Sequence, residues 1–434
     1  MAVRIIAAGD SFITRRLPEK GYEGFEELAG LIRTFDAAFV NLESTFQWHE
    51  GTPAATSGGT WAMSPPETLD DIRRFGFNLF NTANNHTGDY SQDGILATLR
   101  HLEERQMVYA GTGRNLTDAT RAAMLETPRA RVAMIGVTAT FAPEAAAGTQ
   151  GPDVKGRPGL NPLRFKRIHH VNAQHFAMAK ELADVTLINA AKEHSIANGY
   201  TNPFPEGSFT LGNIEFRLTD GAEHVETVPN ARDLARITAE VREARRQADM
   251  VLVSLHAHEM RARKSNEPAG FLETFAHAVI DAGANAVIGH GPHEMRGIEL
   301  YRGGVIFYSI GNFIFETETV AVQPADAFLN KGFTPDTKVG EYMDQRSLNG
   351  TRGYVVQENI WRAVLPGFTV DNGRVTEVKL YPVDLGQKLP RSQRGLPRLT
   401  KAREPMLYLA DLSKPYGTEI TVDEEGVGTV RLRN

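Results

Sequence analysis

The stretch that decides the fold is Ala286-Val287-Ile288-Gly289-His290-Gly291-Pro292-His293. Its first three residues are typical of a buried strand, and the two histidines follow at the carboxyl end of that strand. Open α/β sheets bind ligands outside the carboxyl ends of their strands. Gly291-Pro292 predicts a turn that limits how far the two rings can separate. We therefore interpret His290 and His293 as parts of a ligand-binding site.

Four more apolar runs end in polar side chains in the same way. The polar residues are Asp10 after a run at 3–9, Glu43 after 38–42, Asn85 and His86 after 78–81, and His256 and His258 after 250–255. Imidazole, carboxylate and amide oxygen are ligands that suit divalent transition metals. These strand ends together predict one metal-centred active site.

The composition narrows the class of protein. Of 434 residues, 41% are hydrophobic and 23% are charged, which is ordinary for a soluble globular protein. The net charge of −6 disfavours a general nucleic-acid binder. Because the chain has no cysteine, any metal must be held by nitrogen and oxygen ligands. The sequence has no signal-peptide pattern and no long apolar run, so we expect a cytoplasmic protein without a membrane span; an anchor outside this sequence is the alternative.

The pattern along the chain predicts an α/β fold. Strands and amphipathic helices alternate from 3 to about 137 and again after 230, where helices are expected at 231–248 and 268–282. Between 140 and 230, Gly- and Pro-rich segments surround one expected helix at 170–182. We interpret this region as an insertion that carries substrate specificity, as long inserted loops often do.

The domain organisation follows from the same pattern. We assign 1–317 to one main domain that includes the insertion at 140–230, and 318–434 to a C-terminal extension that packs on it. Strands are expected in the extension near 361–370 and 374–383.

Two segments offer further chemistry, each with an alternative. Asn84-Asn85-His86 carries an amide that can ligate a metal through oxygen and a histidine that can shuttle protons. The alternative is that this segment is a loop in which the asparagines only form a turn. Asp89 either orients His86 or caps the next helix.

In His256-Ala257-His258-Glu259, alternate residues share a face of an extended chain, so both histidines can point the same way. We assign His258, Glu259 and Asn312 to substrate binding. A core or surface position is the alternative for His258, and a role in supporting the ligands is the alternative for Glu259.

Several short motifs lie in a fixed order between residue 4 and about residue 316. They are Gly9-Asp10, Asn41-Leu42-Glu43, Ser64-Pro65-Pro66-Glu67, Ala83-Asn84-Asn85-His86, Asp89-Tyr90, Gly94, Tyr109-Ala110-Gly111-Thr112-Gly113, His256, Gly289-His290-Gly291-Pro292-His293 and Phe307-Tyr308-Ser309-Ile310-Gly311-Asn312-Phe313. Through them the chain resembles the CapA family, which is named for poly-γ-glutamate capsule synthesis and built on the calcineurin-like metallophosphatase fold. The resemblance implies a four-layer α/β/β/α sandwich with an inserted subdomain, a C-terminal extension and a metal site at the strand ends.

The resemblance also implies roles for individual residues. Metal binding is carried over to Asp10, Glu43, Asn85, His256 and either His290 or His293, of which we favour His290. His86 takes the place of the catalytic histidine of the metallophosphatases. One or two divalent ions are expected, and Mn, Zn, Fe and Ca are all open because no thiolate narrows the choice.

Three features depart from the phosphatases of this superfamily. Ser11 and Phe12 follow Asp10, where Asp-x-His is usual; Glu43 replaces the bridging aspartate; and the terminal pair is His-x-x-His rather than His-x-His. A two-metal clamp needs its ions about 3.5–4 Å apart, and the missing ligand at position 12 puts a second ion in doubt. The first two departures are shared with CapA proteins, whereas His258 departs from the His-Trp-Gly that is usual in CapA.

Two reactions suit a metal held by carboxylate, amide and imidazole groups. In the first, the metal activates water and clamps a phosphate, which gives ester hydrolysis. In the second, the metal polarises a peptide carbonyl, one side-chain base removes the Cα proton, and another base returns it from the opposite face, which epimerises the residue from L to D. A non-catalytic component of capsule assembly is a third reading.

The resemblance favours epimerisation, because the capsule polymer contains D- and L-glutamate and a lasso-peptide epimerase is also similar to CapA. We therefore predict a metal-dependent peptide epimerase with His86 and His293 as the proton-transfer pair, for which His258 and Asp10 are substitutes. Histidine suits this role because it titrates near neutral pH. The expected partners are a peptide substrate and, for a precursor peptide, a leader-binding protein.

Overall fold

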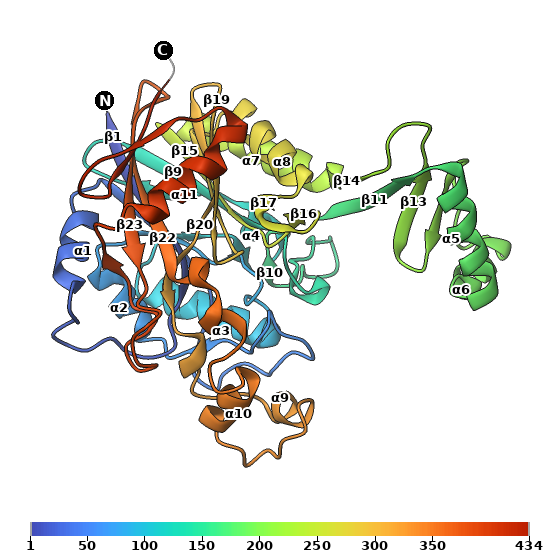
Figure 1. Ribbon diagram of the computed structural model, residues 1–434, viewed down its shortest axis with the longest axis horizontal. Helices are drawn as coiled ribbons and strands as arrows, with labels where there is room; N and C mark the ends of the chain where they lie inside the picture. The colour runs from blue at the N-terminus through green and yellow to red at the C-terminus, as the bar shows by residue number, and fades with distance from the viewer. Residues whose placement is uncertain (1, 433–434) are drawn as a thin grey trace.

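Residues 2–432 are described by a computed structural model, in which two large sheets of mixed strand direction form the centre of the molecule (Figure 1). The ten-stranded sheet runs β25 (Ile420–Val422), β26 (Gly428–Val430), β23 (Arg374–Asp384), β22 (Arg362–Asp371), β1 (Val3–Phe12), β2 (Ala37–Leu42), β5 (Leu79–Asn81) and β6 (Tyr109–Ala110), with β21 (Asn312–Phe315) beside β1 and β24 (Arg398–Leu399) beside β23. The six-stranded sheet runs β19 (Met295–Tyr301), β20 (Gly304–Ile310), β18 (Ala286–His290), β15 (Met250–His256), β9 (Arg131–Thr138) and β8 (Ala123–Glu126). The predicted α/β class is confirmed.

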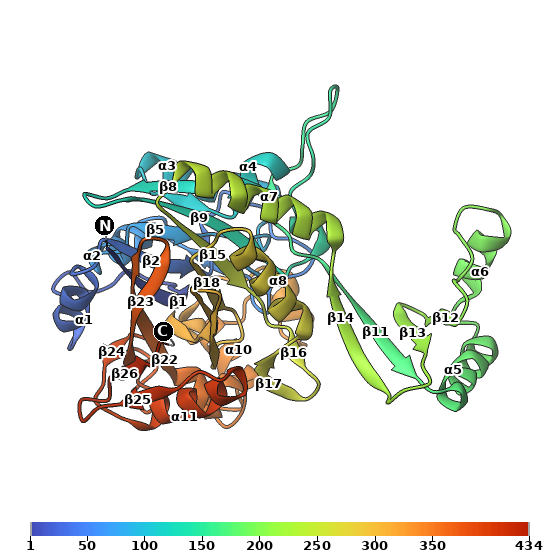
Figure 2. The same ribbon diagram turned by 90° about the horizontal axis from the view of Figure 1, so that it is seen from above.

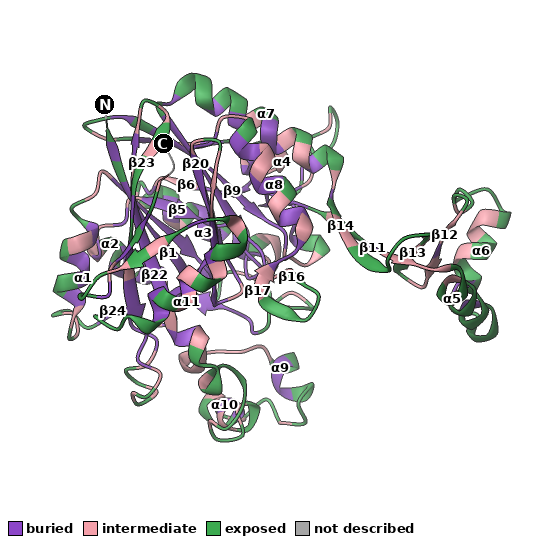
Figure 3. Ribbon diagram, turned by 45° about the horizontal axis from the view of Figure 1, so that its top comes forward, coloured by how far each residue is buried: buried purple, intermediate pink, exposed green. Residues whose placement is uncertain are grey.

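The central strands are buried on both faces, and alternate residues enter different cores (Figure 3). Ile5 of β1 lies in a core that also contains Leu252 of β15, so the two sheets face one another. Ile6 lies in a second core with Leu28 of α1 (Phe25–Ile32) and Leu69 of α2 (Thr68–Arg74). Two-sided burial explains why these strands read as continuous apolar runs.

Two long helices cover the outer face of the six-stranded sheet. Ile237 of α7 (Ala231–Gln247) and Phe275 of α8 (Gly270–Asp281) share a third core with Val251 of β15. Asn230 caps α7, because its side chain accepts hydrogen bonds from the backbone N–H groups of Arg232 and Asp233. The predicted helices at 231–248 and 268–282 are confirmed.

Further helices, short strands and turns complete this part of the chain. They are α3 (Ser91–Glu104), α4 (Leu116–Thr120), α9 (Ala325–Leu329), α10 (Val339–Arg346), α11 (Glu404–Ser413), β3 (Thr45–Phe46), β4 (Met63–Ser64), β7 (Thr112–Gly113), β10 (Gly159–Leu160), β16 (Met260–Arg261), β17 (Lys264–Pro268) and 3-10 turns at Pro143–Ala145, Thr317–Thr319, Gly353–Val356, Glu358–Trp361 and Lys414–Tyr416. Within residues 2–432, none of the helices combines the length and the apolar character needed to cross a bilayer.

Much of the predicted insertion forms a separate lobe that projects from the side of the molecule (Figure 2). Its sheet runs β12 (Ser208–Leu211), β13 (Ile214–Leu218), β11 (Phe165–Val171) and β14 (His224–Pro229), and its helices are α5 (Ala173–Thr186) and α6 (Ala190–Ala197). The helix predicted at 170–182 corresponds to α5, but it begins three residues later than predicted, and α6 was not predicted. His170 belongs to β11, where it pairs with His224, and Asn172 caps α5. The specificity role of this region stays a prediction.

Strands after residue 361 complete the larger sheet. β22 pairs antiparallel with the first half of β1, for example Ile5 with Phe368, and β23 pairs with β22 along its length. The strands expected near 361–370 and 374–383 are confirmed. The domain boundary at 317 stays a prediction.

Candidate metal centre and adjoining cavity

Strand register brings the polar strand ends to one edge. Asp10 of β1 pairs with Asn41 of β2, which pairs with Asn81 of β5. In the other sheet, His256 of β15 pairs with His290 of β18. A ladder of amides crosses the first sheet, because Asn81 Nδ2 donates to Asn41 Oδ1 and Asn41 Nδ2 donates to Asp10 Oδ1, each at 2.7 Å.

Asp10 lies at the centre of the cluster. Its Oδ1 is 3.1 Å from His290 Nδ1 and 3.5 Å from His256 Nδ1, and its Oδ2 is 3.5 Å from His293 Nδ1. The backbone N–H of Gly291 also donates to Oδ2 at 2.8 Å. Burial by itself raises the pKa of Asp10, but hydrogen bonds from the three histidines outweigh it and hold this pKa well below its usual range. Asp10 is therefore an ionised carboxylate.

Close backbone approach makes this geometry possible. A Cβ at Gly9 would lie 1.8 Å from the carbonyl oxygen of Gly311, which accepts a hydrogen bond from the backbone N–H of Asp10. Only glycine therefore allows β1 to pass the 310–312 segment and deliver Asp10 to the site.

Glu43 is fully buried, and neither of its carboxylate oxygens has a hydrogen-bond partner among residues 2–432. Its Oε1 is 3.8 Å from His256 Nε2 and its Oε2 is 3.8 Å from His293 Nδ1. Burial, and then the charges of Asp10 and Asp89, raise the pKa of Glu43 well above its usual value. Two orphaned carboxylate oxygens are costly, and a cation would satisfy them.

The donor set fits a divalent ion. Ligand atoms lie within 4.8 Å of one another in each of three overlapping sets, which are Asp10 with His256 and His290, Glu43 with His256 and His258, and Asp10 with Glu43 and His293. The amide oxygen of Asn85 is also buried without a partner, while its Nδ2 donates to the carbonyl of Gly58 at 2.9 Å. Nitrogen and oxygen ligands of this kind suit Mn, Zn or Fe, and the oxygen ligands alone suit Ca.

Contacts and burial constrain two histidines of the cluster. Ser254 Oγ lies 2.8 Å from His290 Nε2, which leaves Nδ1 of that ring facing Asp10. Burial, despite the hydrogen bond and charge of Asp10, lowers the pKa of His256 to about 4. His256 is therefore uncharged at neutral pH, as a metal ligand must be.

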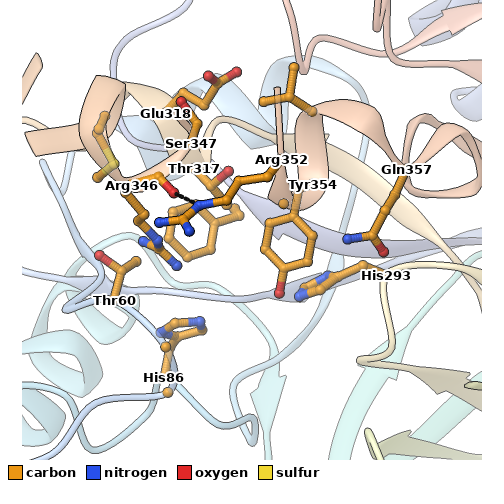
Figure 4. Close-up of a pocket in the computed structure, with 16 residues that line it drawn as sticks. Thr60, His86, His293, Thr317, Glu318, Arg346, Ser347, Arg352, Tyr354 and Gln357 are labelled. Atoms are coloured by element: carbon orange, nitrogen blue, oxygen red, sulfur yellow. Dashed lines mark hydrogen bonds between the residues drawn. The ribbon is translucent and has the colours of Figure 1, made fainter. Parts of the chain in front are cut away.

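A cavity of about 210 Å³ adjoins the cluster, and both His86 and His293 line it (Figure 4). His86 Nδ1 is 2.7 Å from Asp89 Oδ2, which also accepts from the backbone N–H of Ala62. The orienting role predicted for Asp89 is confirmed, and the cap at the start of α3 is Tyr90 instead. His86 Nε2 makes no hydrogen bond with residues 2–432.

His293 is held by Asn312. Its Nδ1 lies 2.9 Å from Asn312 Oδ1, and the amide nitrogen of Asn312 donates to the carbonyls of His293 and Ile360 at 3.2 and 2.9 Å. These two donations orient the amide, so that its oxygen faces the ring. His293 also adopts a φ of 62°, a conformation that non-glycine residues rarely adopt.

The three residues assigned to substrate binding are not among the residues that line this cavity. Asn312 positions His293 and is not among the cavity-lining residues. His258 Nε2 is 3.1 Å from His256 Nε2, and burial, then the charges of His256 and His293, lower the pKa of His258 well below its usual value. Glu259 accepts a hydrogen bond from Thr140 Oγ1 at 2.9 Å. Their contact with substrate stays a prediction.

The residue that departs from the phosphatase motif has a clear place. Phe12 is buried at the cavity, and its ring packs edge-on against His86 with centroids 5.1 Å apart. An aromatic ring without a ligand atom therefore packs beside His86 at this end of β1.

Several residues at the site were given no role in the sequence analysis. Asn41 and Ser254 carried a signal, because each is a polar residue inside an apolar strand, and Ser254 shares a face with His256. The cavity is also lined by Arg346, Arg352 and Tyr354. Their segment has no hydrophobic periodicity, and no feature of its sequence indicated a place at the site.

Metal binding is expected to release protons from Glu43, because its raised pKa favours the neutral acid whereas a ligand must be ionised. The affinity for metal should accordingly fall as the pH falls. Titration calorimetry in two buffers of different ionisation enthalpy measures the released protons. Glu43→Gln, which has no proton to release, is the control; equal release from both proteins would contradict the expectation.

Comparison with known proteins identifies the family of this chain. The family described as "Bacterial capsule synthesis protein PGA_cap" matches residues 4–317. Two uncharacterized proteins of Sinorhizobium fredii (strain NBRC 101917 / NGR234), y4sH and y4uA, are each 32% identical over 443 residues, which cover 99% of this chain and 93% of each relative. The capsule biosynthesis protein CapA of Bacillus anthracis is 26% identical over 250 residues, 58% of this chain and 43% of that protein. The chain therefore belongs to the PGA_cap family of bacterial capsule synthesis proteins, the family of CapA.

Proposed function

We propose that this protein is a metal-dependent epimerase that converts one residue of a peptide or poly-amino-acid substrate from L to D. The observation that carries the proposal is that His86 and His293 line one cavity and are held in the same way. Each Nδ1 faces an acceptor oxygen, Asp89 Oδ2 for His86 and Asn312 Oδ1 for His293. Each Nδ1 therefore carries the proton, and each Nε2 is left to accept one.

The division of labour follows from these contacts. His86 Nε2 would remove the Cα proton, and Asp89 would stabilise the imidazolium that forms. His293, reaching the same cavity from the turn after β18, would act in its protonated form and supply the proton on its Nε2 to the other face of the substrate. Proton exchange with water would then restore both rings for the next turnover. Which histidine acts first depends on whether the substrate residue is L or D.

Asp10, Glu43, Asn85, His256 and His290 would hold the metal. When bound, a divalent ion supplies a Lewis acid that polarises the peptide carbonyl and so acidifies the neighbouring Cα–H. The buried, desolvated cluster favours such an electrostatic effect, because charges interact more strongly away from water.

We also propose that the two facing sheets and their outer helices correspond to the calcineurin-like metallophosphatase sandwich. Phosphate ester hydrolysis is therefore the second candidate function. The overlap of the ligand sets at Asp10 and Glu43 favours it, because shared carboxylates suit a pair of ions. Phe12 in place of a histidine ligand argues against it.

The discriminating experiment follows deuterium at Cα in D2O. Metal-loaded protein is incubated with a panel of short L-peptides that includes glutamate-containing ones, and phosphate release from p-nitrophenyl phosphate is measured in parallel. We expect deuterium incorporation and D-residues, both lost on chelation. Phosphate release without incorporation would overturn the proposal in favour of hydrolysis. Metal binding with neither reaction would overturn it in favour of a non-catalytic role in capsule assembly.

The partners follow from the same proposal. The substrate would be a peptide chain, and a precursor peptide would require a leader-binding protein in addition. Such a protein would add substrate affinity without contributing to the chemistry at Cα.

A further inference from the structure

One wall of the cavity is formed by two arginines from a segment beyond the part of the chain that the family matches. Arg346 is the last residue of α10 and Arg352 follows six residues later. The family match ends at residue 317. Figure 4 shows both guanidinium groups directed into the cavity on the side of Thr60 and His86.

Neither guanidinium is neutralised. Within residues 2–432, Arg346 makes no side-chain hydrogen bond or ion pair, and the only such contact of Arg352 is Nε to the backbone carbonyl of Arg346 at 2.9 Å. That bond anchors the Arg352 side chain to the end of α10 and leaves its terminal N–H groups unpaired. In contrast, many other arginines among the described residues form an ion pair with a carboxylate, as Arg15 does with Glu316.

The cavity offers the arginines no acidic partner. Glu318 is the only carboxylate among the residues that line it, and this group is paired with Arg394 at 2.7 Å and Arg391 at 3.5 Å. The wall therefore carries two uncompensated positive charges. Two neighbouring guanidinium groups repel each other, and a bound anion would relieve the repulsion. Arginine suits a planar carboxylate because its fork can donate two parallel hydrogen bonds.

We propose that Arg346 and Arg352 form an anion subsite that binds a carboxylate of the peptide substrate. The identification of the bound peptide as the substrate rests on the proposed function, but binding of a carboxylate to the two arginines does not depend on catalysis. The carboxylate belongs either to an acidic side chain or to the C-terminus of the peptide. In either case the subsite holds an acidic group in the same cavity as His86 and His293, and so selects which residue of the chain reacts.

The test measures binding of three probes to metal-loaded protein by titration calorimetry. The probes are acetyl-Ala-Glu-Ala-amide, acetyl-Ala-Gln-Ala-amide and acetyl-Ala-Gln-Ala with a free C-terminus. At least one carboxylate probe should bind about 10-fold or more tightly than the neutral probe, and its affinity should fall with added salt because the arginines are exposed. Comparison of the two carboxylate probes distinguishes the side chain from the C-terminus.

The double variant Arg346→Gln/Arg352→Gln should lose this preference, with unchanged metal content and thermal stability. Arg346→Lys should lose part of it, because the charge is kept without the fork. Arg242→Gln is the matched control, since Arg242 is an exposed arginine of α7 without an ion pair among the described residues. It should bind all three probes as the wild type does.

Three results would overturn the subsite. One is equal binding of all probes. Another is a preference that survives the double variant, since a carboxylate would then bind the metal cluster instead. The third is arginine-dependent binding of inorganic phosphate that is tighter than that of either carboxylate probe. Arginine-dependent binding of a carboxylate probe without Cα exchange would support the subsite and contradict the epimerase proposal. Cα exchange on all peptides, with or without the two arginines, would support the epimerase proposal and overturn the subsite.

Discussion

Asp10→Asn is expected to abolish metal binding and, with it, all metal-dependent activity. Asp10 is an ionised carboxylate whose two oxygens face His290, His256 and His293, and no other carboxylate of residues 2–432 reaches all three rings. The amide would also present an N–H group toward a donor, either Asn41 Nδ2 or the backbone N–H of Gly291. The loss of metal affinity should exceed the roughly 10–100-fold typical of a residue that only supports a ligand.

Thermal unfolding with and without metal measures this effect. At an ion concentration about 100 times the dissociation constant, the wild type should gain about 2.7 kcal/mol of stability, and Asp10→Asn should gain none. Comparison in chelator separates metal loss from misfolding. Glu43→Gln is the second variant, because neither oxygen of Glu43 has a hydrogen bond to lose. It should fold as well as the wild type and still bind metal far more weakly; undiminished binding by both variants would contradict the proposed centre.

His86→Gln is expected to reduce Cα exchange by about 10²–10⁴-fold, the usual contribution of a general acid–base group, while leaving the metal in place. His86 belongs to none of the sets of potential ligands, and its Nδ1 is engaged by Asp89. The readouts are deuterium incorporation at Cα and metal content of the same sample. Retained exchange would refute the role of His86, and lost metal would make it a ligand.

Two further variants make this prediction sharper. Asp89→Asn should lower exchange less than His86→Gln does, because it removes the group that orients the ring but keeps the base. His293→Gln distinguishes proton transfer from metal ligation as the role of His293. Both roles are open because His293 Nδ1 lies near Asp10 and Glu43 as well as Asn312. Lost exchange with retained metal would support proton transfer, and lost metal would support ligation.

The strand ends could be predicted because local pattern encodes them. Asp10, His256 and His290 each end an apolar run, and parallel strands of one sheet present those ends at one edge. The lobe at 165–229 could not be predicted in this way. Its strands are only partly buried, so β11 shows no apolar pattern that would separate it from the helix that follows.

The sequence by itself determined which residues stand at the edge of the sheets, because backbone periodicity and burial fix where each strand ends. Only the tertiary structure decided what each nitrogen atom of a histidine faces. Many of those contacts join residues that are distant in the chain, as Asp10 and His290 are. The tertiary structure also placed Arg346 and Arg352 in the wall of the cavity that His86 lines, since a segment without periodicity is positioned by packing rather than by its own pattern. Local sequence specifies the secondary structure of each segment, whereas side-chain contacts and cavity walls depend on which segments pack against one another.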